Sequence, residues 1–341
     1  MKDLNLGGPK LTIAIPTYNR LSCLTLLLNS VSAQFLKAPR LNNEVEVLVM
    51  DNASSDGTAE YLDKFAQIPN FRSKRQVRNL GSDANITDCF EEASGEYVWI
   101  IGDDDLPMLG SILLVLEFVS AEEVDLLYLP AQWEFCELTE FSSLSIQSCE
   151  VSSVSRLALV GKSLEYVTFI SSWIVNRVNY YRYAGDNASH AGAHCGSTIC
   201  QLEWIFTMIA NGRRFACANV AGIIARGAAS GGYSLFEVFS SNYTKIVREK
   251  FCDEEEIGEI FLNCMLIRFF PGIIWNSRFC VAGDFSDFRA DPVLTMVGDS
   301  FGRGVYFRLI ISPLCTANRA TAWFVKKIAS VYARYWRFMI R

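Results

Sequence analysis

The sequence is poor in the residues that build the common zinc and redox sites. It has two histidines, and its eleven cysteines include no CxxC pair and no Cys/His group at zinc spacing. Cys195 and Cys200 are too far apart for a zinc knuckle. Scattered thiols of this kind are typical of buried side chains in a reducing compartment. The composition therefore argues against a zinc site or a disulfide framework.

Long hydrophobic segments are missing too. Residues 1–10 are polar and contain glycine, and the first apolar run has only the length of a strand, so we expect no signal peptide. We find no segment with the roughly 18 apolar residues that span a bilayer. Internal repeats and low-complexity tracts are also absent. We therefore expect a cytoplasmic protein.

Acidic residues are absent from the C-terminal end. After Asp299 the chain carries eight positive charges, which leaves −14 on residues 1–299 out of a total net charge of −6. The cations are Arg303, Arg308, Arg319, Lys326, Lys327, Arg334, Arg337 and Arg341. Among them lie the apolar residues Phe307, Trp323, Phe324, Val325, Tyr332, Tyr335, Trp336 and Phe338.

A basic helix rich in aromatic residues suits the interface of an anionic membrane, where the rings lie at headgroup depth. The alternative is a helix that packs its aromatic face against its own domain. Nucleic acid is not expected as a partner, because the acidic body of the chain would repel a phosphate backbone.

The N-terminal half alternates strand and helix patterns. Residues 11–16 and 45–50 are apolar strands, and the second is followed by the polar segment 51–58. Residues 58–67 form a helical candidate that begins after Ser/Asp capping residues. A first helix is indicated by apolar residues at helical spacing, namely Leu24, Leu27, Leu28 and Val31. This order is typical of a doubly wound α/β domain, and 341 residues with 50% apolar content can bury a sizeable core.

Three consecutive carboxylates, Asp103-Asp104-Asp105, follow the apolar run 97–101. Several like charges at the end of a buried strand are stable only when a cation or hydrogen-bond donors compensate them. A hard divalent metal meets that need. The alternative is a solvated Asp-rich turn. Ligands of open parallel sheets bind at the carboxyl ends of the strands, which favours a site.

Four segments carry a family resemblance: residues 12–20, 49–58, 78–81 and 95–105. In this order they resemble the motifs of the family-two nucleotide-sugar glycosyltransferases with the A-type fold. The resemblance implies an α/β fold with a doubly wound, mostly parallel sheet and a mainly helical C-terminal extension. Beyond these segments the chain is similar, more weakly, to bacterial members that transfer sugars, including deoxysugars, onto surface polysaccharide or lipid-linked precursors.

The resemblance also implies a donor site at the strand ends. It places base and ribose contacts after the first strand, a hydrogen-bonding carboxylate after the second, and a diphosphate or sugar contact in the segment 78–81. The corresponding residues are Pro16, Thr17, Tyr18, Arg20, Asp51, Arg78 and Asn79. Asn19 and Asn52 are as well explained by turn formation as by ligand contact.

The acid triplet is similar to the DxD-type motif of this family. On that basis Asp105 coordinates Mg²⁺ or Mn²⁺, and Asp103 or Asp104 contacts the ribose or the metal. A metal held there acts as a Lewis acid on the departing diphosphate. Each single Asp has an alternative role as the N-cap of the helix that follows.

An inverting transfer also needs a base for the acceptor hydroxyl. The family has a pair of acids in this region, and this chain has Glu203 without the paired acid. We expect Glu203 to be the base, with His194 and Asp186 as rivals. Trp204 either walls the acceptor site or fills the core.

The predicted organisation is a nucleotide-sugar-binding half over residues 1–140, an acceptor-binding half over 141–300 and a basic aromatic segment over 301–341. The Ser-rich stretch 141–155 marks the boundary, and 227–232 is predicted to be a loop. We expect a metal-dependent inverting glycosyltransferase, peripheral on the inner face of the cell membrane. It would transfer a hexosyl or deoxyhexosyl group from a nucleotide sugar to a glycan or lipid-linked saccharide in surface polysaccharide synthesis.

Two alternatives remain open at this point. One is a non-catalytic nucleotide-binding or polysaccharide-assembly protein of the same fold, since site residues can be lost without losing the sheet. The other is a nucleotidyltransferase. That class should show a glycine-rich basic loop after the first strand, and residues 16–20 contain no glycine.

Overall fold

The computed structural model describes residues 8–65, 67–134, 145–146, 149–185, 191–226, 234–280 and 288–340, without the side chains of residues 165 and 337–340. Asp186, the predicted loop 227–232 and part of the Ser-rich stretch 141–155 lie outside the described residues. The chain packs as two compact units. The first runs to residue 159 and includes 168–196 and 200–228; the second contains 160–167, 197–199 and the residues after 228. The division into donor and acceptor halves is functional and stays a prediction.

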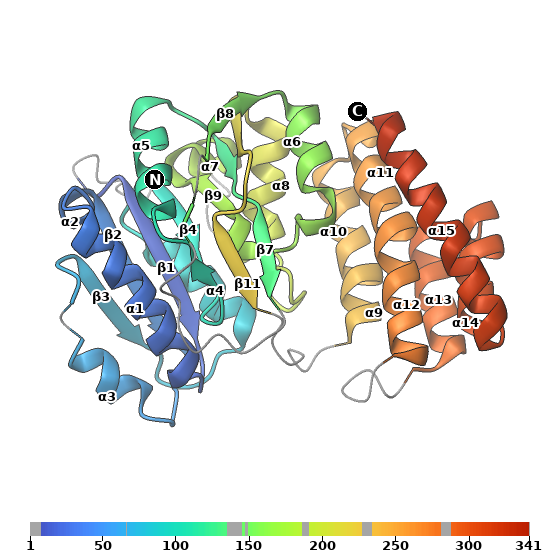
Figure 1. Ribbon diagram of the computed structural model, residues 1–341, viewed down its shortest axis with the longest axis horizontal. Coiled ribbons are helices and arrows are strands. Elements are labelled where there is room, and N and C mark those ends of the chain that lie inside the picture. Colours follow the sequence, from blue (N-terminus) through green and yellow to red (C-terminus); the bar gives the residue numbers. More distant parts are fainter. Residues whose placement is uncertain are drawn as a thin grey trace. The chain divides into compact units, whose positions relative to one another are not determined.

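A mixed sheet of eight strands organises the first unit (Figure 1), in the order β3-β2-β1-β4-β9-β6-β10-β8. The strands are β1 (Leu11–Thr17), β2 (Val45–Asp51), β3 (Phe71–Arg75), β4 (Tyr97–Ile100), β6 (Leu126–Tyr128), β8 (Val151–Val154), β9 (Trp173–Asn176) and β10 (Phe215–Ala218). β3, β2, β1 and β4 are mutually parallel, whereas β9 runs antiparallel to both β4 and β6. The parallel half is the doubly wound part predicted from the sequence.

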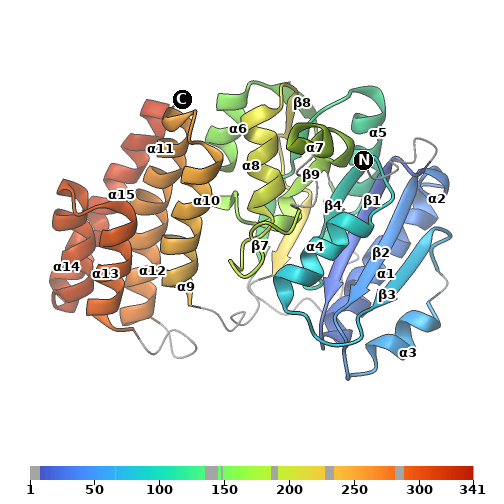
Figure 2. The ribbon, with the colours of Figure 1, turned by 180° about the vertical axis from the view of Figure 1, so that it is seen from behind.

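Helices cover both faces of this sheet. Figure 1 shows α1 (Leu21–Lys37) in front of the sheet, and its buried leucines share a core with Ile13, Val47 and Trp99 and with α5 (Ser111–Ala121). Figure 2, from behind, shows the other face with α4 (Ser82–Glu92), α7 (Arg177–Ala184) and α8 (Leu202–Asn211). Because side chains alternate along a strand, the near-continuous apolar runs fit strands that are buried on both faces.

The helix predicted over 58–67 is shorter in the structure. Between β1 and β3 the unit also has α2 (Leu41–Glu44) and α3 (Thr58–Asp63). At the end of α3 the N–H groups of Lys64 and Phe65 donate to carbonyls three residues back, at Tyr61 and Leu62, in the tighter pattern in which helices often end.

A second, three-stranded sheet was not predicted. It has the order β5-β11-β7 and consists of β5 (Leu106–Pro107), β11 (Ile223–Arg226) and β7 (Ala131–Glu134). β5 follows the acid triplet directly, and β11 pairs with it antiparallel. This small sheet therefore brings a segment more than a hundred residues away to the triplet.

The described part of the second unit is helical. Its helices are α9 (Leu235–Glu237), α10 (Tyr243–Lys250), α11 (Glu255–Cys264), α12 (Phe270–Phe279), α13 (Ala290–Phe301), α14 (Ser312–Thr316) and α15 (Arg319–Ile340). α11 and α12 join into one helix over Glu255–Phe279, which by length and composition alone could cross a membrane. Sequence inspection had found no such segment. In the structure 61% of its most apolar stretch is buried, as in the core helix of a folded domain.

Candidate active site

The carboxyl ends of the parallel strands meet at one edge of the large sheet. Thr17, the last residue of β1, pairs in register with Asp51, the last residue of β2, and β4 runs parallel to β1 on its other side. The acid triplet follows β4 at this edge. Thr17 Oγ1 donates a hydrogen bond of 2.7 Å to Asp103 Oδ2. The sheet thus brings three of the predicted segments together.

Arg20 connects the loop after β1 to two of the acids. Its Nη1 lies 3.2 Å from Asp103 Oδ1 and 2.7 Å from Asp104 Oδ2. Asp103 is buried, whereas the Arg20 side chain is 38% exposed. One guanidinium therefore compensates parts of two carboxylates and leaves the third to other partners.

Asp105 is held by donors from two distant segments. Ser171 Oγ donates to its Oδ2 at 2.6 Å, and the backbone N–H of Arg226 donates to its Oδ1 at 3.3 Å. Ser171 Oγ in turn accepts from the Gly102 N–H at 2.9 Å. The Arg226 side chain donates to the carbonyl of Asp104. These contacts fix the orientation of the carboxylate before any ligand binds.

The triplet nevertheless holds more negative charge than its surroundings compensate. Burial raises the pKa of Asp103 to about 6. Burial, and then the charge of Asp104, raise the pKa of Asp105 to about 7. Both carboxyls are less than a tenth exposed. A bound cation would relieve this cost, because it stabilises the ionised forms.

The donor set fits a hard divalent cation. Within the described residues, no three His, Cys, Asp or Glu side chains are already grouped as a metal site. Mg²⁺, however, is commonly bound through one or two carboxylates, with substrate phosphates and water completing the octahedron. Asp103 and Asp105 supply two oxygen donors of the right kind, although Arg20 contacts Asp103 as well as Asp104.

Asp51 has an unused acceptor. Its Oδ1 accepts from the Ser54 N–H at 2.9 Å. Its Oδ2 is buried and, among the described residues, accepts no hydrogen bond; the nearest cation is Arg75 Nε at 3.5 Å. A buried acceptor without a donor costs free energy, and a ligand N–H or O–H at the strand end would satisfy it.

Asn52 and Asn19 have turn-forming roles in the structure. Asn52 Nδ2 donates to Asn79 Oδ1 at 3.0 Å and to the Gly81 carbonyl at 3.1 Å, while its Oδ1 accepts from the Leu80 N–H at 2.9 Å. Asn19, at φ 52°, accepts from the Ser55 N–H at 2.7 Å. The loops after β1, β2 and β3 are thereby tied to one another.

The remaining donor-site candidates lie at the same edge. Tyr18 is 43% exposed and available to a ligand, and Pro16 precedes the end of β1. Arg78 and Asn79 are exposed in the segment that Asn52 holds.

Two of the three base candidates, Glu203 and His194, contact each other; the third, Asp186, lies outside the described residues. Glu203, near the start of α8, is buried, and its Oε2 lies 3.1 Å from Nε2 of the buried His194. Tyr180 and Thr207 each donate to Glu203 Oε1 at 3.4 Å. Burial, and then the charge of Glu203, raise the pKa of Tyr180. The two side chains thus form a close carboxylate–imidazole pair, which we call the Glu203–His194 unit.

Trp204, the neighbour of Glu203, fills the core. It is buried and stacks on Phe90 with ring centroids 4.5 Å apart. Of the two roles considered for it, the structure supports the packing role.

Sequence reasoning missed Ser171 and Arg226. Ser171 lies 66 positions after Asp105 and Arg226 lies 121 positions after it. A serine in a short helical turn and an arginine at the end of an apolar strand carry no local signal of a shared site. Only the pairing of β11 with β5 brings Arg226 to the triplet.

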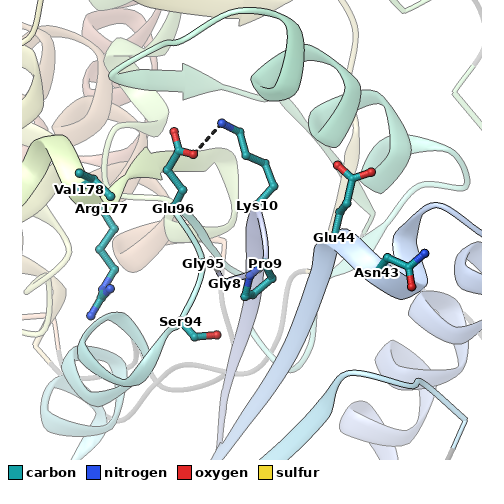
Figure 3. A pocket seen from close by; sticks show the side chains of 10 residues that line it. All are labelled: Gly8, Pro9, Lys10, Asn43, Glu44, Ser94, Gly95, Glu96, Arg177 and Val178. Atoms are coloured by element: carbon teal, nitrogen blue, oxygen red, sulfur yellow. Dashed lines mark hydrogen bonds and ion pairs between the residues drawn. The ribbon is translucent and has the colours of Figure 1, made fainter. Parts of the chain in front are cut away.

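A pocket of about 280 Å³ lies at the opposite edge of the sheet, at the amino ends of β1 and β4 (Figure 3). Lys10 and Glu96 point toward each other across it and form an ion pair of 2.7 Å. The charges of Lys10 and Glu96 compensate each other, and the pocket lies away from the strand ends at which ligands of parallel sheets bind. We do not assign the reaction to it.

Comparison with known proteins identifies the α/β unit. Residues 12–181 match the model of the family described as glycosyl transferase family 2. This segment belongs to that family. The resemblance predicted from the four sequence segments is confirmed, and the matched range contains the acid triplet, Arg20, Asp51 and Ser171.

Named relatives include two bacterial transferases. The abequosyltransferase RfbV of Salmonella typhimurium is 33% identical over 132 residues, or 38% of each chain. The GalNAc(5)-diNAcBac-PP-undecaprenol beta-1,3-glucosyltransferase of Campylobacter jejuni is 30% identical over 112 residues, which are 32% of this chain and 34% of that protein. The match thus covers little more than a third of the length of these relatives.

Solved structures extend the likeness of fold over the chain. The crystal structure of S. aureus TarS 1–349 in complex with UDP-GlcNAc gives a TM-score of 0.62 at 19% identity, and the alignment covers 96% of this chain and 92% of that one. The S. aureus TarS 1–349 crystal structure with UDP gives 0.53 at 18% identity, over 96% and 91%. The A-type glycosyltransferase fold predicted from the sequence is confirmed.

Proposed function

We propose that this chain is a metal-dependent inverting glycosyltransferase. It transfers a hexosyl or deoxyhexosyl group from a nucleotide sugar to a glycan or lipid-linked saccharide in surface polysaccharide synthesis. The observation that carries the proposal is the buried pair Asp103 and Asp105, which keeps uncompensated negative charge at the ligand-binding edge of a family-two domain. A structural role alone would not require three carboxylates at this place.

The donor nucleotide lies across the ends of β1 and β2. Asp51 Oδ2 accepts a hydrogen bond from the base or the ribose, since it is buried and has an unused lone pair. The exposed ring of Tyr18 packs against the base, and Thr17 and Pro16 shape the floor. Asn79, held by Asn52, meets the diphosphate or the donor sugar.

Asp105, with Asp103, would hold the cation. When bound, Mg²⁺ or Mn²⁺ supplies Lewis-acid stabilisation to the leaving diphosphate. Ser171 and the Arg226 N–H orient Asp105, and Thr17 orients Asp103. Arg20 holds the Asp104 carboxylate through its contact of 2.7 Å, and Asp104 can accept a hydrogen bond from a ribose hydroxyl.

The acceptor proton is taken by the Glu203–His194 unit. Glu203 is the residue predicted from the sequence to be the base. The Glu203 carboxylate lies 3.1 Å from the imidazole, close enough to orient the ring, as in nucleophile-activating pairs. The two residues therefore function as one base, and the acceptor hydroxyl approaches this pair.

The acceptor class and the cellular location complete the proposal. The name of the Campylobacter jejuni relative includes PP-undecaprenol, which supports a lipid-linked acceptor. We place the enzyme on the cytoplasmic face of the cell membrane, where an acceptor of that kind and a soluble nucleotide sugar can meet.

A panel of nucleotide sugars tests the function. Purified protein is incubated with each donor, with Mg²⁺, Mn²⁺ or a chelator, and nucleotide release is measured. We expect one donor class to be turned over only with metal, and Asp105→Asn to abolish that turnover. Asp63→Asn, at an exposed position on α3, is the control for a change of one charge. Folded protein that releases nucleotide from no donor, or at the same rate in chelator, would contradict the proposal.

A further inference from the structure

The C-terminal helix α15 presents large apolar side chains to solvent. Among its described side chains, those that it buries against the helical unit are mostly small: Ala322, Val325, Ala329 and Trp336. The opposite face carries Phe324, Ile328, Val331 and Tyr335, which are 61%, 45%, 65% and 62% exposed. An amphipathic helix on a soluble protein normally has the reverse arrangement, with its larger apolar residues inside.

These four exposed residues form one continuous stripe. Their spacing of four, three and four positions places them on the same face of the helix, one above the other. We call them the outer stripe. Trp323 and Tyr332, 51% and 41% exposed, flank it. Scattered exposed apolar residues need no explanation, but a contiguous apolar patch marks an interaction site.

The patch continues onto the neighbouring helical segment. The rings of Tyr306 and Tyr332 lie 5.4 Å apart, which joins the segment before α14 to the flank of the outer stripe. In that segment Val305 and Leu309, four positions apart, are 74% and 64% exposed. Both ribbon views show α14 beside α15 (Figures 1 and 2).

The positive charge of this region indicates which partner the apolar patch binds. α15 carries Arg319, Lys326, Lys327, Arg334 and Arg337, and the chain has no acidic residue after Asp299. Lys327 lies 5.4 Å from the Trp323 ring, on the border of the outer stripe. A second copy of the helix would bring cations against cations. A surface of anionic phospholipid offers phosphates to the cations and an apolar layer to the stripe.

We propose that the outer stripe of α15, with Val305 and Leu309, docks on an anionic membrane surface, with α15 lying in the plane of the interface. The sequence left two possibilities for the aromatic tail, membrane contact or core packing, and the structure divides its residues between them. Phe307, Val325 and Trp336 belong to the core, and the outer stripe is left for the lipid. The inference deepens the proposed function by naming the surface that would bring the enzyme to a lipid-linked acceptor.

Vesicle binding by the full chain tests the inference. The vesicles contain phosphatidylcholine alone or mixed with phosphatidylglycerol, and no donor or metal is added. We expect binding to the anionic vesicles that weakens as salt rises. The affinity of the triple variant Phe324→Ser/Ile328→Ser/Val331→Ser for these vesicles should be lower by a factor of about ten or more, because the variant lacks apolar area that inserts into the interface. Leu36→Ser removes an 83% exposed leucine from α1 and should bind like the unchanged chain.

Two outcomes would overturn the inference. One is a folded triple variant that binds anionic vesicles as tightly as the unchanged chain. The other is an unchanged chain that ignores vesicles but self-associates in solution, with the triple variant monomeric, which would make a second copy the occupant. If the triple variant fails to fold, the test is made on the unchanged chain with brominated lipid, which quenches the fluorescence of the exposed Trp323 if α15 docks. Absence of quenching refutes docking. Since no step requires sugar transfer, failure of the proposed function would leave this result intact.

Discussion

Replacing Asp105 by Asn should make the protein more stable at alkaline pH while it abolishes transfer. Asp105 is 4% exposed, and its pKa is raised from 3.8 to about 7 by burial and by the charge of Asp104. When the pKa of a carboxyl is higher in the folded than in the unfolded state, the folded state binds more protons at any pH between the two pKa values. The stability of the unchanged protein, without metal, therefore falls as pH rises from about 4 to about 7.

The size of the effect follows from the shift. A pKa shift of about three units means that the ionised Asp105 destabilises the unchanged protein by about 4 kcal/mol at pH 8. The Asn variant does not have this destabilisation, because Asn carries no charge. Asn costs something in return. Its oxygen can accept from Ser171, but its amide then faces the Arg226 N–H, which loses a hydrogen bond of 3.3 Å worth about 1 kcal/mol. The net stabilisation at pH 8 should be about 1–3 kcal/mol, and at pH 4 the variant should be slightly less stable than the unchanged protein.

Urea unfolding in chelator, at pH 4 and pH 8, measures this difference directly. Asp63→Asn, the exposed matched control, should show the same difference from the unchanged protein at both values of pH. If Asp105→Asn is destabilising by the same amount at both, the carboxylate is compensated in the apo protein, and the reasoning about a site that awaits a cation fails. If it keeps its rate of transfer, Asp105 does not hold the metal.

The other predictions concern the base, the donor loop and the sheet. Glu203→Gln should lower turnover by about 10² or more with donor affinity by calorimetry unchanged, and an equal loss of donor affinity would make Glu203 a donor-site or structural residue. Asn52→Ala should change the donor KM and kcat unequally, with the factor by which KM rises about ten times the factor by which kcat falls. The reason is that three hydrogen bonds that hold residues 79–81 are lost. An unchanged KM would exclude that segment from the donor site. Gly95→Ala should cost about 1–3 kcal/mol in urea unfolding, since the new Cβ would lie 2.6 Å from a backbone nitrogen of β1, whereas Gly161→Ala, with open space, should not destabilise.

The sequence predicted β1, β2 and β4 of the parallel half of the sheet, because each of them carries its own apolar signal. It did not predict β3, whose residues Phe71–Arg75 are mostly polar and charged. Residues 11–16 and 45–50 are short apolar runs followed by polar turn residues, and the structure extends each by only one residue, to Thr17 and Asp51. These patterns are local, so they can be recognised without knowledge of tertiary contacts. The acid triplet was recognised for the same reason, as charge placed directly after an apolar run.

The antiparallel strands and the partners of Asp105 could not be predicted in this way. β9 and β11 have only four residues each, and short apolar runs do not distinguish strand from buried helix. Which residues meet the triplet depends on how those strands pair. Ser171 and Arg226 are therefore visible only in the folded chain, although they determine how Asp105 is oriented.

The outer stripe shows a different limit of sequence reasoning. Hydrophobic spacing reports that a helix has an apolar face, but not which of two apolar faces is covered. Trp336 and Tyr335 are neighbours in the sequence, and one is 8% exposed while the other is 62% exposed. The distinction comes from packing against the other helices of the unit, which one-dimensional periodicity does not contain.

The acid triplet explains why the site draws its supports from so many segments. Two buried carboxylates with raised pKa values destabilise the folded chain, and no single neighbour could compensate them without occupying the place of a ligand. Thr17, Ser171 and the Arg226 N–H instead each donate one hydrogen bond, and Arg20 provides a charge from the partly exposed side. These contacts hold the oxygens in position but leave negative charge uncompensated. In the proposed function, this arrangement would provide affinity for a cation at the expense of the stability of the metal-free protein, as expected where function rather than folding determines the residue.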